Sequence, residues 1–334
     1  MDTDMSRSEK TVLCIGISVL DIIARPVGAP DSWKEKQRIE SISLLPGGDA
    51  ANQSIHLASL GCHALFNGCV GDDANGKTVR LALEGRGVDT SLLRVRDGVR
   101  TGTALLLVSS DGERHIFSVA GAHSTLSRRD LPDEIPEGCA AISLGSLFGM
   151  PVLEEEGLLE FLQKVRAQEI PVFADMDSGR VTALPERIRR LLPYIDYFLP
   201  SAYDIMPLMG KDTIVEAAHS LLKAGVRHVI VKCGAEGALV FEGTDIAGSA
   251  DTGRAEGNGV RIGAVPVQPL DTSGAGDCMS AAFIYRILEG DQIEEACRYA
   301  CAAGSLSTLY PGANTIELQD IKVREMMGEA EKIL

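Results

Sequence analysis

Short apolar segments alternate with longer amphipathic segments along most of the chain. The short segments are apolar at consecutive positions, which is typical of parallel strands that are buried on both faces. The longer segments repeat apolar residues at helical spacing, which indicates helices with one buried face. The predicted strands are Val12–Ile17, Ala64–Cys69, Thr103–Ser109, His115–Ala120, Ala141–Leu144, Val172–Asp175, Tyr197–Leu199, His228–Lys232 and Ala238–Phe241. The predicted helices are Ala50–Leu60, Gly76–Gly85, Leu153–Gln168, Ile214–Ala224, Gly276–Leu288 and Ile293–Leu309. This alternation predicts an α/β protein with a mostly parallel central sheet covered by helices on both faces.

Two segments interrupt the alternation, because each contains β pattern without a helix. Residues 25–46 include an alternating stretch, Arg38–Leu45, and residues 96–120 contain two strand patterns joined by Ser110-Asp111-Gly112-Glu113. Asp-Gly between β-rich runs is a strong hairpin signal. We therefore predict a small β-sheet of residues 25–46 and 96–120 that projects as a lid or dimer contact. The core would comprise residues 11–24, 47–95 and 121–334.

Composition narrows the class of protein. The 334 residues are 45% hydrophobic and 24% charged, with a formal net charge of −15. This charge disfavours nucleic acid and anionic membranes as partners, because both require basic patches. The start of the chain, Met1–Lys10, lacks the pattern of a signal peptide, so the protein is predicted to be cytoplasmic. The eight cysteines are scattered without a CxxC pair, which predicts free buried thiols.

The densest chemical motif is Asp271-Thr272-Ser273-Gly274-Ala275-Gly276-Asp277, directly before a helical pattern. Gly274, Ala275 and Gly276 allow close approach of the backbone, and a helix that begins here aims unpaired N–H groups at an anion. Asp277, beside this anion hole, is suited to accept a proton from an attacking hydroxyl. One N-capping aspartate would explain Asp277 alone but not the whole motif. The loop is not a Walker A motif, because no Gly-Lys-Ser/Thr follows.

This segment resembles a signature of the ribokinase-like (PfkB) carbohydrate kinases. A second signature matches Gly47-Gly48-Asp49-Ala50-Ala51-Asn52-Gln53, and a third match is Gly16-Ile17-Ser18-Val19-Leu20-Asp21 at the end of the first strand. The matches keep the family's order and spacing over nearly the whole chain. The resemblance implies a ribokinase-like three-layer α/β/α sandwich with a small β-sheet lid.

The resemblance assigns sugar-binding roles to residues of both units. Asp21, Gly47, Gly48 and Asn52 would bind the hydroxyls of the substrate, and Arg100 and His123 would face it from the lid side. Without the resemblance, Asp21 is also consistent with a strand-end cap, the glycines with a turn before a helix, and His123 with an exposed turn.

The resemblance also assigns nucleotide and cation sites. Lys232, Gly234 and Gly237 would border ATP, and the helix Ile293–Leu309 would supply the adenine side. Ser201 stands where the family's Asn-x-x-Glu motif has Asn, and Asp204 stands in place of Glu. Asp204 would act on Mg²⁺ through water, although a first-turn helix acid is an alternative interpretation. Asp271, Ser273 and Gly312 would surround a monovalent cation such as K⁺.

The predicted function is ATP-dependent phosphorylation of a hydroxyl on a small sugar, ribose-like or ketohexose-like, by a kinase that forms a homodimer through its lid. One alternative is a nucleoside kinase of the same family, for which Trp33 and Phe117 are the only large rings in the lid. Another is a catalytically weak sugar or nucleotide sensor, which the Ser201 substitution keeps open. A dinucleotide oxidoreductase is disfavoured, because no GxGxxG follows the first strand.

The monovalent cation is directly testable. If K⁺ binds at Asp271, Ser273 and Gly312, the rate of phosphate transfer should fall when K⁺ is replaced by Na⁺ or Tris. A coupled ADP-release assay measures this, and an unchanged rate would remove K⁺ from the mechanism.

Overall fold

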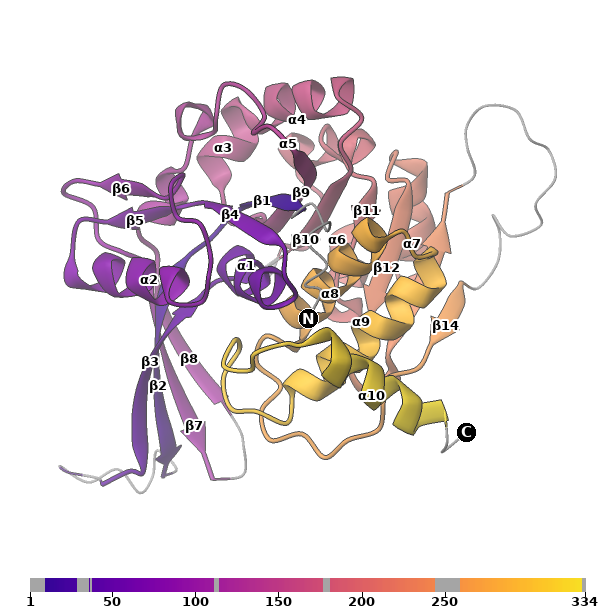
Figure 1. Cartoon of the computed structure of the whole chain (residues 1–334). Coiled ribbons are helices and arrows are strands. Elements are labelled where there is room, and N and C mark those ends of the chain that lie inside the picture. Colours follow the sequence, from indigo (N-terminus) through magenta and orange to yellow (C-terminus); the bar gives the residue numbers. More distant parts are fainter. Residues whose placement is uncertain are drawn as a thin grey trace, which may run out of the picture.

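The computed structural model describes residues 10–28, 36, 38–110, 114–176, 181–243 and 259–331, with side chains as far as Gly328 (Figure 1). Trp33 and most of the predicted hairpin turn, Asp111–Glu113, lie outside the described residues.

The large sheet has eight strands in the order β14-β13-β12-β11-β10-β9-β1-β4. All neighbours from β4 to β12 are parallel, whereas β13 and β14 are added antiparallel. The predicted mostly parallel sheet is therefore confirmed. The strands are β1 (Thr11–Ile15), β4 (His63–Asn67), β9 (Cys139–Leu147), β10 (Val172–Met176), β11 (Tyr197–Phe198), β12 (His228–Lys232), β13 (Ala238–Glu242) and β14 (Val260–Ile262).

Helices cover both faces of this sheet because successive strand side chains point to opposite sides. In β1, Val12 and Cys14 pack into one core cluster, and Leu13 and Ile15 pack into the other. The first cluster includes buried residues of α1 (Asp49–Ser59), α2 (Ala74–Glu84), α8 (Ala275–Glu289), α9 (Ile293–Ser307) and α10 (Asp320–Glu331). The second includes α3 (Pro151–Glu156), α4 (Leu158–Ala167), α5 (Glu186–Arg189), α6 (Ala202–Met209) and α7 (Ile214–Lys223).

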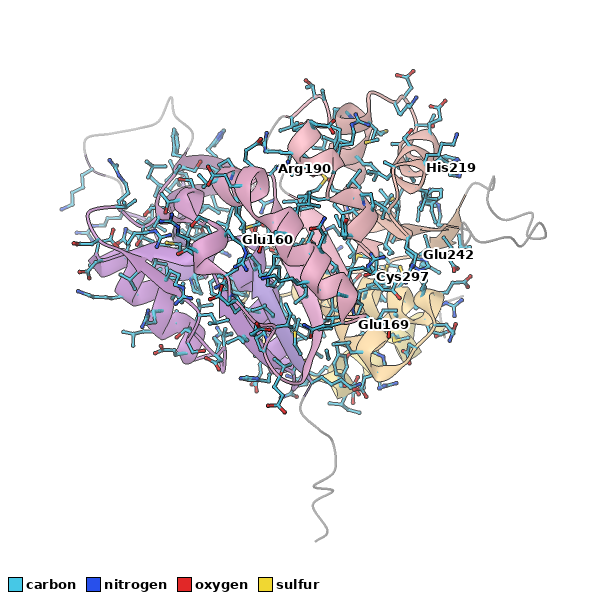
Figure 2. The ribbon with its side chains drawn as sticks, turned by 90° about the horizontal axis from the view of Figure 1, so that it is seen from above. Glu160, Glu169, Arg190, His219, Glu242 and Cys297 are labelled. Atoms are coloured by element: carbon cyan, nitrogen blue, oxygen red, sulfur yellow. The ribbon has the colours of Figure 1, made fainter. Side chains whose placement is uncertain are left out.

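The view from above separates these two helical layers. Glu160 and Arg190 lie in the part of the ribbon drawn in pink, whereas Cys297 lies at the edge of the C-terminal helices drawn in yellow (Figure 2). The arrangement is the three-layer α/β/α sandwich that the pattern predicts.

One predicted helix is wrong as drawn from the sequence. The pattern Leu153–Gln168 forms two helices, α3 and α4, because the backbone leaves the helical conformation at Gly157, where φ is −153° and ψ is −13°. A Cβ on Gly157 would lie 2.2 Å from the Cβ of Arg128, so the neighbouring chain passes too close for a side chain. The helices α6 and α10 and the strands β6 (Arg94–Arg96) and β14 were not predicted, because they are short or lack a strong pattern.

The second sheet has the order β3-β2-β7-β8 and forms the projecting unit in Figure 1. Its strands are β2 (Val19–Val27), β3 (Ser41–Gly47), β7 (Thr103–Ser109) and β8 (Arg114–Val119). The second sheet begins before residue 25, the predicted start of the lid. Its strand β2 begins at Val19, which pairs with Gly47. Asp21 therefore lies in the second sheet rather than at the end of the first strand. We call this sheet the lid.

Asp73 joins the lid to the core. Its carboxylate caps α2 by accepting a 2.7 Å hydrogen bond from the Gly76 N–H. The same carboxylate accepts from the N–H and the hydroxyl of Thr101, two residues before β7, at 2.8 and 2.6 Å. Because α2 belongs to the core, this contact fixes the base of β7. The small parallel pair β5 (Cys69–Gly71) and β6 lies beside it.

All eight cysteines are free thiols, and six of them are buried. This confirms the prediction of buried thiols. Within the ranges that the structure describes, no helix is long and apolar enough to cross a membrane.

Candidate active site

The motif Asp271–Asp277 forms the loop that leads into α8. Gly274 caps the helix with a φ of +67°, and a Cβ there would lie 2.5 Å from the carbonyl oxygen of Ala313. Only glycine satisfies both constraints at low cost. No side chain caps α8, so its first-turn N–H groups are oriented toward the space before the helix. Asp277 is the third residue of α8 and is not the N-cap, so capping does not explain it.

Asp277 is buried, with 8% of its surface exposed. Asn52 of α1 donates a 2.8 Å hydrogen bond to its Oδ2, and the amide of Gln53 lies 3.5 Å from its Oδ1. Asn314 in turn donates to the Oδ1 of Asn52 at 2.6 Å, which fixes the orientation of that amide. Burial and the negative charge of Asp175 raise the pKa of Asp277, against the opposing effects of Asn52 and Lys232. The carboxylate is therefore held in place and made more basic.

Asp21 lies against the glycines that begin α1. A Cβ on Gly47 would lie 2.2–2.5 Å from the Asp21 carboxylate, so this glycine makes room for the acid. Gly48 has a φ of +94°, and a Cβ there would lie 2.6 Å from the carbonyl oxygen of Ile17. Burial raises the pKa of Asp21 to about 6. Asp21, Gly47, Gly48 and Asn52 therefore come together from β2, β3 and α1.

The two remaining acceptor candidates differ in their placement. Arg100 is exposed, and its backbone carbonyl accepts a 2.8 Å hydrogen bond from Ala122. No contact of its side chain with the other candidates is seen among the described residues. His123 is half-buried in a 3₁₀ turn, with its ring against Gly102, and burial lowers its pKa. Binding of the acceptor by Arg100 and His123 therefore stays a prediction.

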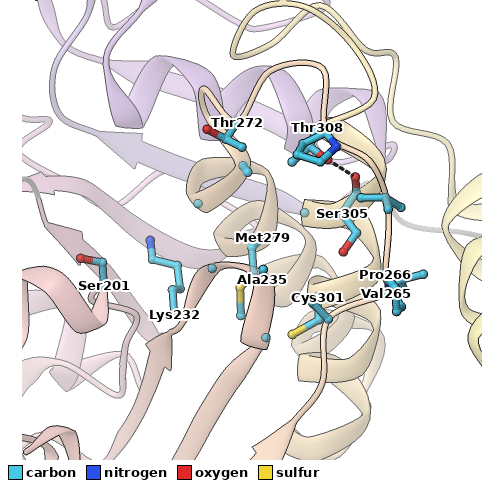
Figure 3. Close-up of a pocket in the computed structure, with 18 residues that line it drawn as sticks. Ser201, Lys232, Ala235, Val265, Pro266, Thr272, Met279, Cys301, Ser305 and Thr308 are labelled. Carbon is cyan, nitrogen blue, oxygen red and sulfur yellow. Dashed lines mark hydrogen bonds between the residues drawn. The ribbon is translucent and has the colours of Figure 1, made fainter. Parts of the chain in front are cut away.

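A cavity of about 600 Å³ opens beside the first turn of α8. Figure 3 shows Ser201 and Lys232 at one end and Cys301, Val265 and Pro266 at the other. All four predicted nucleotide residues line this cavity, as do Ala275 and Gly276. The full lining is Ser201, Lys232, Gly234, Ala235, Gly237, Ala264, Val265, Pro266, Val267, Pro269, Thr272, Ala275, Gly276, Met279, Cys301, Gly304, Ser305 and Thr308.

The two ends of the cavity differ in chemistry. The end near α8 combines first-turn N–H groups with the ammonium of Lys232, which suits phosphate groups. The other end is mostly apolar and is lined by the helix α9, which suits a flat heterocycle. Gly237 has a φ of +87°, and a Cβ there would lie 2.0 Å from the carbonyl oxygen of Ile262, so the turn at this wall requires glycine.

Ser201 and Asp204 form a local pair at the start of α6. The Ser201 hydroxyl donates to the Asp204 Oδ2 at 2.5 Å and accepts from the Asp204 N–H at 3.1 Å. Ser201 thus caps the helix, and only Ser201 of the pair lines the cavity. No cluster of three or more His, Cys, Asp or Glu side chains with metal-binding geometry occurs in the described part of the chain. A Mg²⁺ ion that keeps most of its waters is held by one or two carboxylates besides phosphates, so the action of Asp204 on Mg²⁺ through water stays a prediction.

Asp271 is compensated by the groups around it. Its two carboxylate oxygens accept hydrogen bonds of 2.9 Å from the N–H groups of Ser273 and Gly312. Arg25 and Arg114 of the lid lie 3.9 and 3.8 Å from the same carboxylate. Burial would raise the pKa of Asp271, but these hydrogen bonds and the charge of Arg114 lower it overall. Oxygen ligands for a monovalent cation are present, yet the cation would share Asp271 with two guanidinium groups.

Several residues of the site were not singled out from the sequence. Gln53, Asp175 and Asn314 contribute to the polar network around Asp277, and Arg114 also bonds to the hydroxyls of Thr272 and Ser273. Gln53 is the last residue of a recognised motif, and Asp175 ends a predicted strand, so both had a weak signal. Asn314 lies two residues after Gly312 of the predicted cation site, so it also had a weak signal. Arg114 had none, because only folding brings it to the loop.

The comparisons with known proteins agree with this geometry. A ribokinase of Arabidopsis thaliana is 31% identical over 277 residues, which cover 80% of this chain and 68% of the relative. An aminoimidazole riboside kinase of Salmonella typhimurium is 28% identical over 297 residues, covering 85% of this chain and 88% of the relative. The solved structure of Arabidopsis thaliana ribokinase with ribose and ATP has a TM-score of 0.76 and 26% identity, and the match covers 96% of this chain and 99% of that one. The family model of the pfkB family carbohydrate kinases matches residues 9–320, and the chain belongs to this family of sugar kinases.

Proposed function

We propose that this protein transfers the γ-phosphate of ATP to a hydroxyl of a small, unphosphorylated sugar of the ribose type. One observation carries the proposal. The buried carboxylate of Asp277 directly follows Ala275 and Gly276, which line the cavity, and it accepts a hydrogen bond from Asn52. A base in this position has the phosphate donor on one side and the acceptor on the other.

The acceptor hydroxyl would attack the γ-phosphorus while its proton passes to Asp277. The bond between the γ-phosphorus and the bridging oxygen breaks, and ADP leaves with the electron pair. The N–H groups of Gly274, Ala275, Gly276 and Asp277 would hold the charge on the phosphoryl oxygens. The raised pKa of Asp277 makes it a stronger base than an ordinary carboxylate, which favours proton removal near neutral pH.

Mg²⁺ would be held by the ATP phosphates and, through water, by Asp204 at the start of α6. When bound, it supplies positive charge that compensates the phosphates. Asp204, which is shorter than the family's glutamate, and its partner Ser201 still present oxygen atoms at the start of α6. The K⁺ site at Asp271, Ser273 and Gly312 stays a prediction, with Arg25 and Arg114 as competing cations.

The acceptor assignment rests on the polar character of its end of the site. Asp21 and Asn52 present a carboxylate and an amide, which suit vicinal hydroxyls, and Gly47 and Gly48 allow the sugar to approach the backbone. The similarity to ribokinases supports ribose, whereas the similarity to a riboside kinase keeps a nucleoside as the second candidate. Phe117, the only large ring among the described lid residues, is 58% exposed and offers no enclosed stacking surface.

The lid would also mediate a homodimer. Its outer strands expose large apolar side chains on one face of the sheet, namely Ile42, Leu44, Phe117 and Val119, each at 45–68%. Apolar groups that gather on the surface of a projecting sheet are typical of an interface. The unpaired edges of β3 and β8 offer further hydrogen-bonding groups to a second copy.

The first prediction concerns the reaction itself. Asp277→Asn removes the base but keeps the shape, so the rate of ADP release with the preferred sugar should fall about 10²–10⁴-fold. A panel of sugars and nucleosides, assayed with wild-type protein, first identifies the acceptor. Asp196→Asn is the control, because Asp196 is a buried, paired acid at the opposite end of the strands. Near-normal turnover of a folded Asp277→Asn protein would reject Asp277 as the base.

The second prediction concerns the acceptor end. Gly47→Ala places a methyl group inside the space of the Asp21 carboxylate, so Asp21 must move. The KM for the sugar should rise roughly tenfold or more, as expected from the loss of a charged hydrogen bond, while the KM for ATP stays unchanged. Gly328→Ala is the control, because its Cβ would contact nothing within 4 Å. Equal changes in both KM values would argue against a sugar site at Asp21.

The third prediction concerns assembly. Phe117→Lys places a charge on the apolar face of β8 at a side chain that is 58% exposed, so it should convert a dimer to a monomer. Sedimentation velocity at one protein concentration measures this. Ile321→Lys on α10, where the side chain is 60% exposed, is the matched control. A dimer that survives the Phe117 substitution would place the interface elsewhere, and a monomeric wild type would reject the homodimer.

A further inference from the structure

A buried ion pair joins the ends of two strands beneath the cavity. Lys232, the last residue of β12, donates a 2.6 Å hydrogen bond to the Oδ2 of Asp175 near the end of β10. Only 13% of the Lys232 side chain and 5% of the Asp175 side chain are exposed. The short strand β11 lies between β10 and β12, so the lysine side chain must cross it to reach Asp175.

Asp175 is saturated with donors. Besides Lys232, its Oδ2 accepts from the hydroxyl of Ser280 at 2.7 Å and from the amide of Gln53 at 3.1 Å, and its Oδ1 accepts from the N–H of Met176 at 2.8 Å. A buried carboxylate with these partners is fixed in position. Its location is therefore set by α1 and α8 as well as by its own strand.

Besides its contact with Asp175, Lys232 faces the cavity. It lines the cavity, and a Cβ on Gly276 would lie 3.3 Å from its Nζ. The ammonium thus lies at the first turn of α8. It has three N–H donors, of which Asp175 at 2.6 Å and Ser280 at 3.4 Å accept two. Among the described residues no acceptor is found for the third, which is therefore available to a ligand in the cavity.

We propose that Asp175 is a positioning residue, which holds Lys232 at the first turn of α8 so that the ammonium binds the terminal phosphate of ATP. The proposal rests on the proposed kinase function. It adds a fixed cation to the helix N–H groups at the site of developing phosphoryl charge. The glycine at position 276 is part of the same arrangement, because a side chain there would displace the lysine or the phosphate.

Asp175 also acts on the base. Gln53 lies between the two carboxylates, 3.1 Å from Asp175 and 3.5 Å from Asp277, and its Oε1 accepts from Ser143 at 2.8 Å. The titratable groups that face Asp277 are Asp175 from β10 and Lys232 from β12, while α1 contributes neutral amides. Removing the negative charge of Asp175 removes its repulsion of the Asp277 carboxylate. The positive charge of Lys232 then acts on Asp277 without an opposing charge. Both effects lower the pKa of Asp277.

The role of Lys232 is tested by binding. Wild-type protein and Lys232→Met are titrated with the non-hydrolysable imido analogue of ATP and with ADP, in Mg²⁺, by calorimetry. Lys232→Met should lose about tenfold or more in affinity for the triphosphate, and about threefold or less for ADP. Equal losses for both nucleotides, or no loss, would reject a contact with the terminal phosphate. Thermal melting verifies that the variant is folded.

The role of Asp175 is tested by the pH dependence of kcat/KM. In Asp175→Asn, kcat should fall at least about fivefold, and the acidic midpoint of the profile should move to lower pH by about half a unit or more. Asp196→Asn, which also removes a buried paired acid, should leave the midpoint in place. A lower melting temperature with an unmoved midpoint in Asp175→Asn would mean a structural role only, and would overturn the proposal.

The two experiments separate this inference from the proposed function. The binding experiment needs no acceptor, so a loss of triphosphate selectivity in Lys232→Met supports the lysine contact even if no sugar in the panel is phosphorylated. Conversely, an active sugar kinase whose Lys232→Met variant keeps this selectivity rejects the lysine contact alone.

Discussion

The burial of the Asp277 carboxylate is the constraint on which the rest of the site depends. A charge in the protein interior is unfavourable unless donors surround it. Those donors come from Asn52 and Gln53 of α1, so α1 must lie directly beside α8. Small residues allow this approach, because Ala50, Ala51, Ala281 and Ala282 are all fully buried between these helices and the sheet. The packing of the core is thus adapted to one carboxylate.

The two ends of the site use the same chemistry for different purposes. Asp21 and Asp277 are both buried enough to have raised pKa values, but Asp21 belongs to the lid and Asp277 to the core. Because Asp73 binds Thr101 at the base of β7, the lid sheet is anchored to α2 of the core. The acceptor end is therefore assembled from two units, and its geometry depends on the contact between them.

The fold was predictable to a large extent because its signals are local. Runs such as His228–Lys232 are apolar enough to be recognised as buried strands, and that strand appears with the predicted bounds. Errors arose where a neighbour in space decides the outcome. The helix break at Gly157 follows from the closeness of Arg128, and the early start of β2 follows from its pairing with β3. Neither neighbour is adjacent in the sequence.

The same division holds for the anion hole at Asp277. By itself, the sequence determined the glycine-rich loop, the helix that follows it and the Gly-Gly segment before α1, because backbone conformation and helix initiation depend on nearby residues. Only the tertiary structure decided that Asp175 and Lys232 pair beneath this helix, and that Arg25 and Arg114 approach Asp271. Such contacts join residues far apart in the chain, and their charges interact through distances that only the packing of sheets and helices sets.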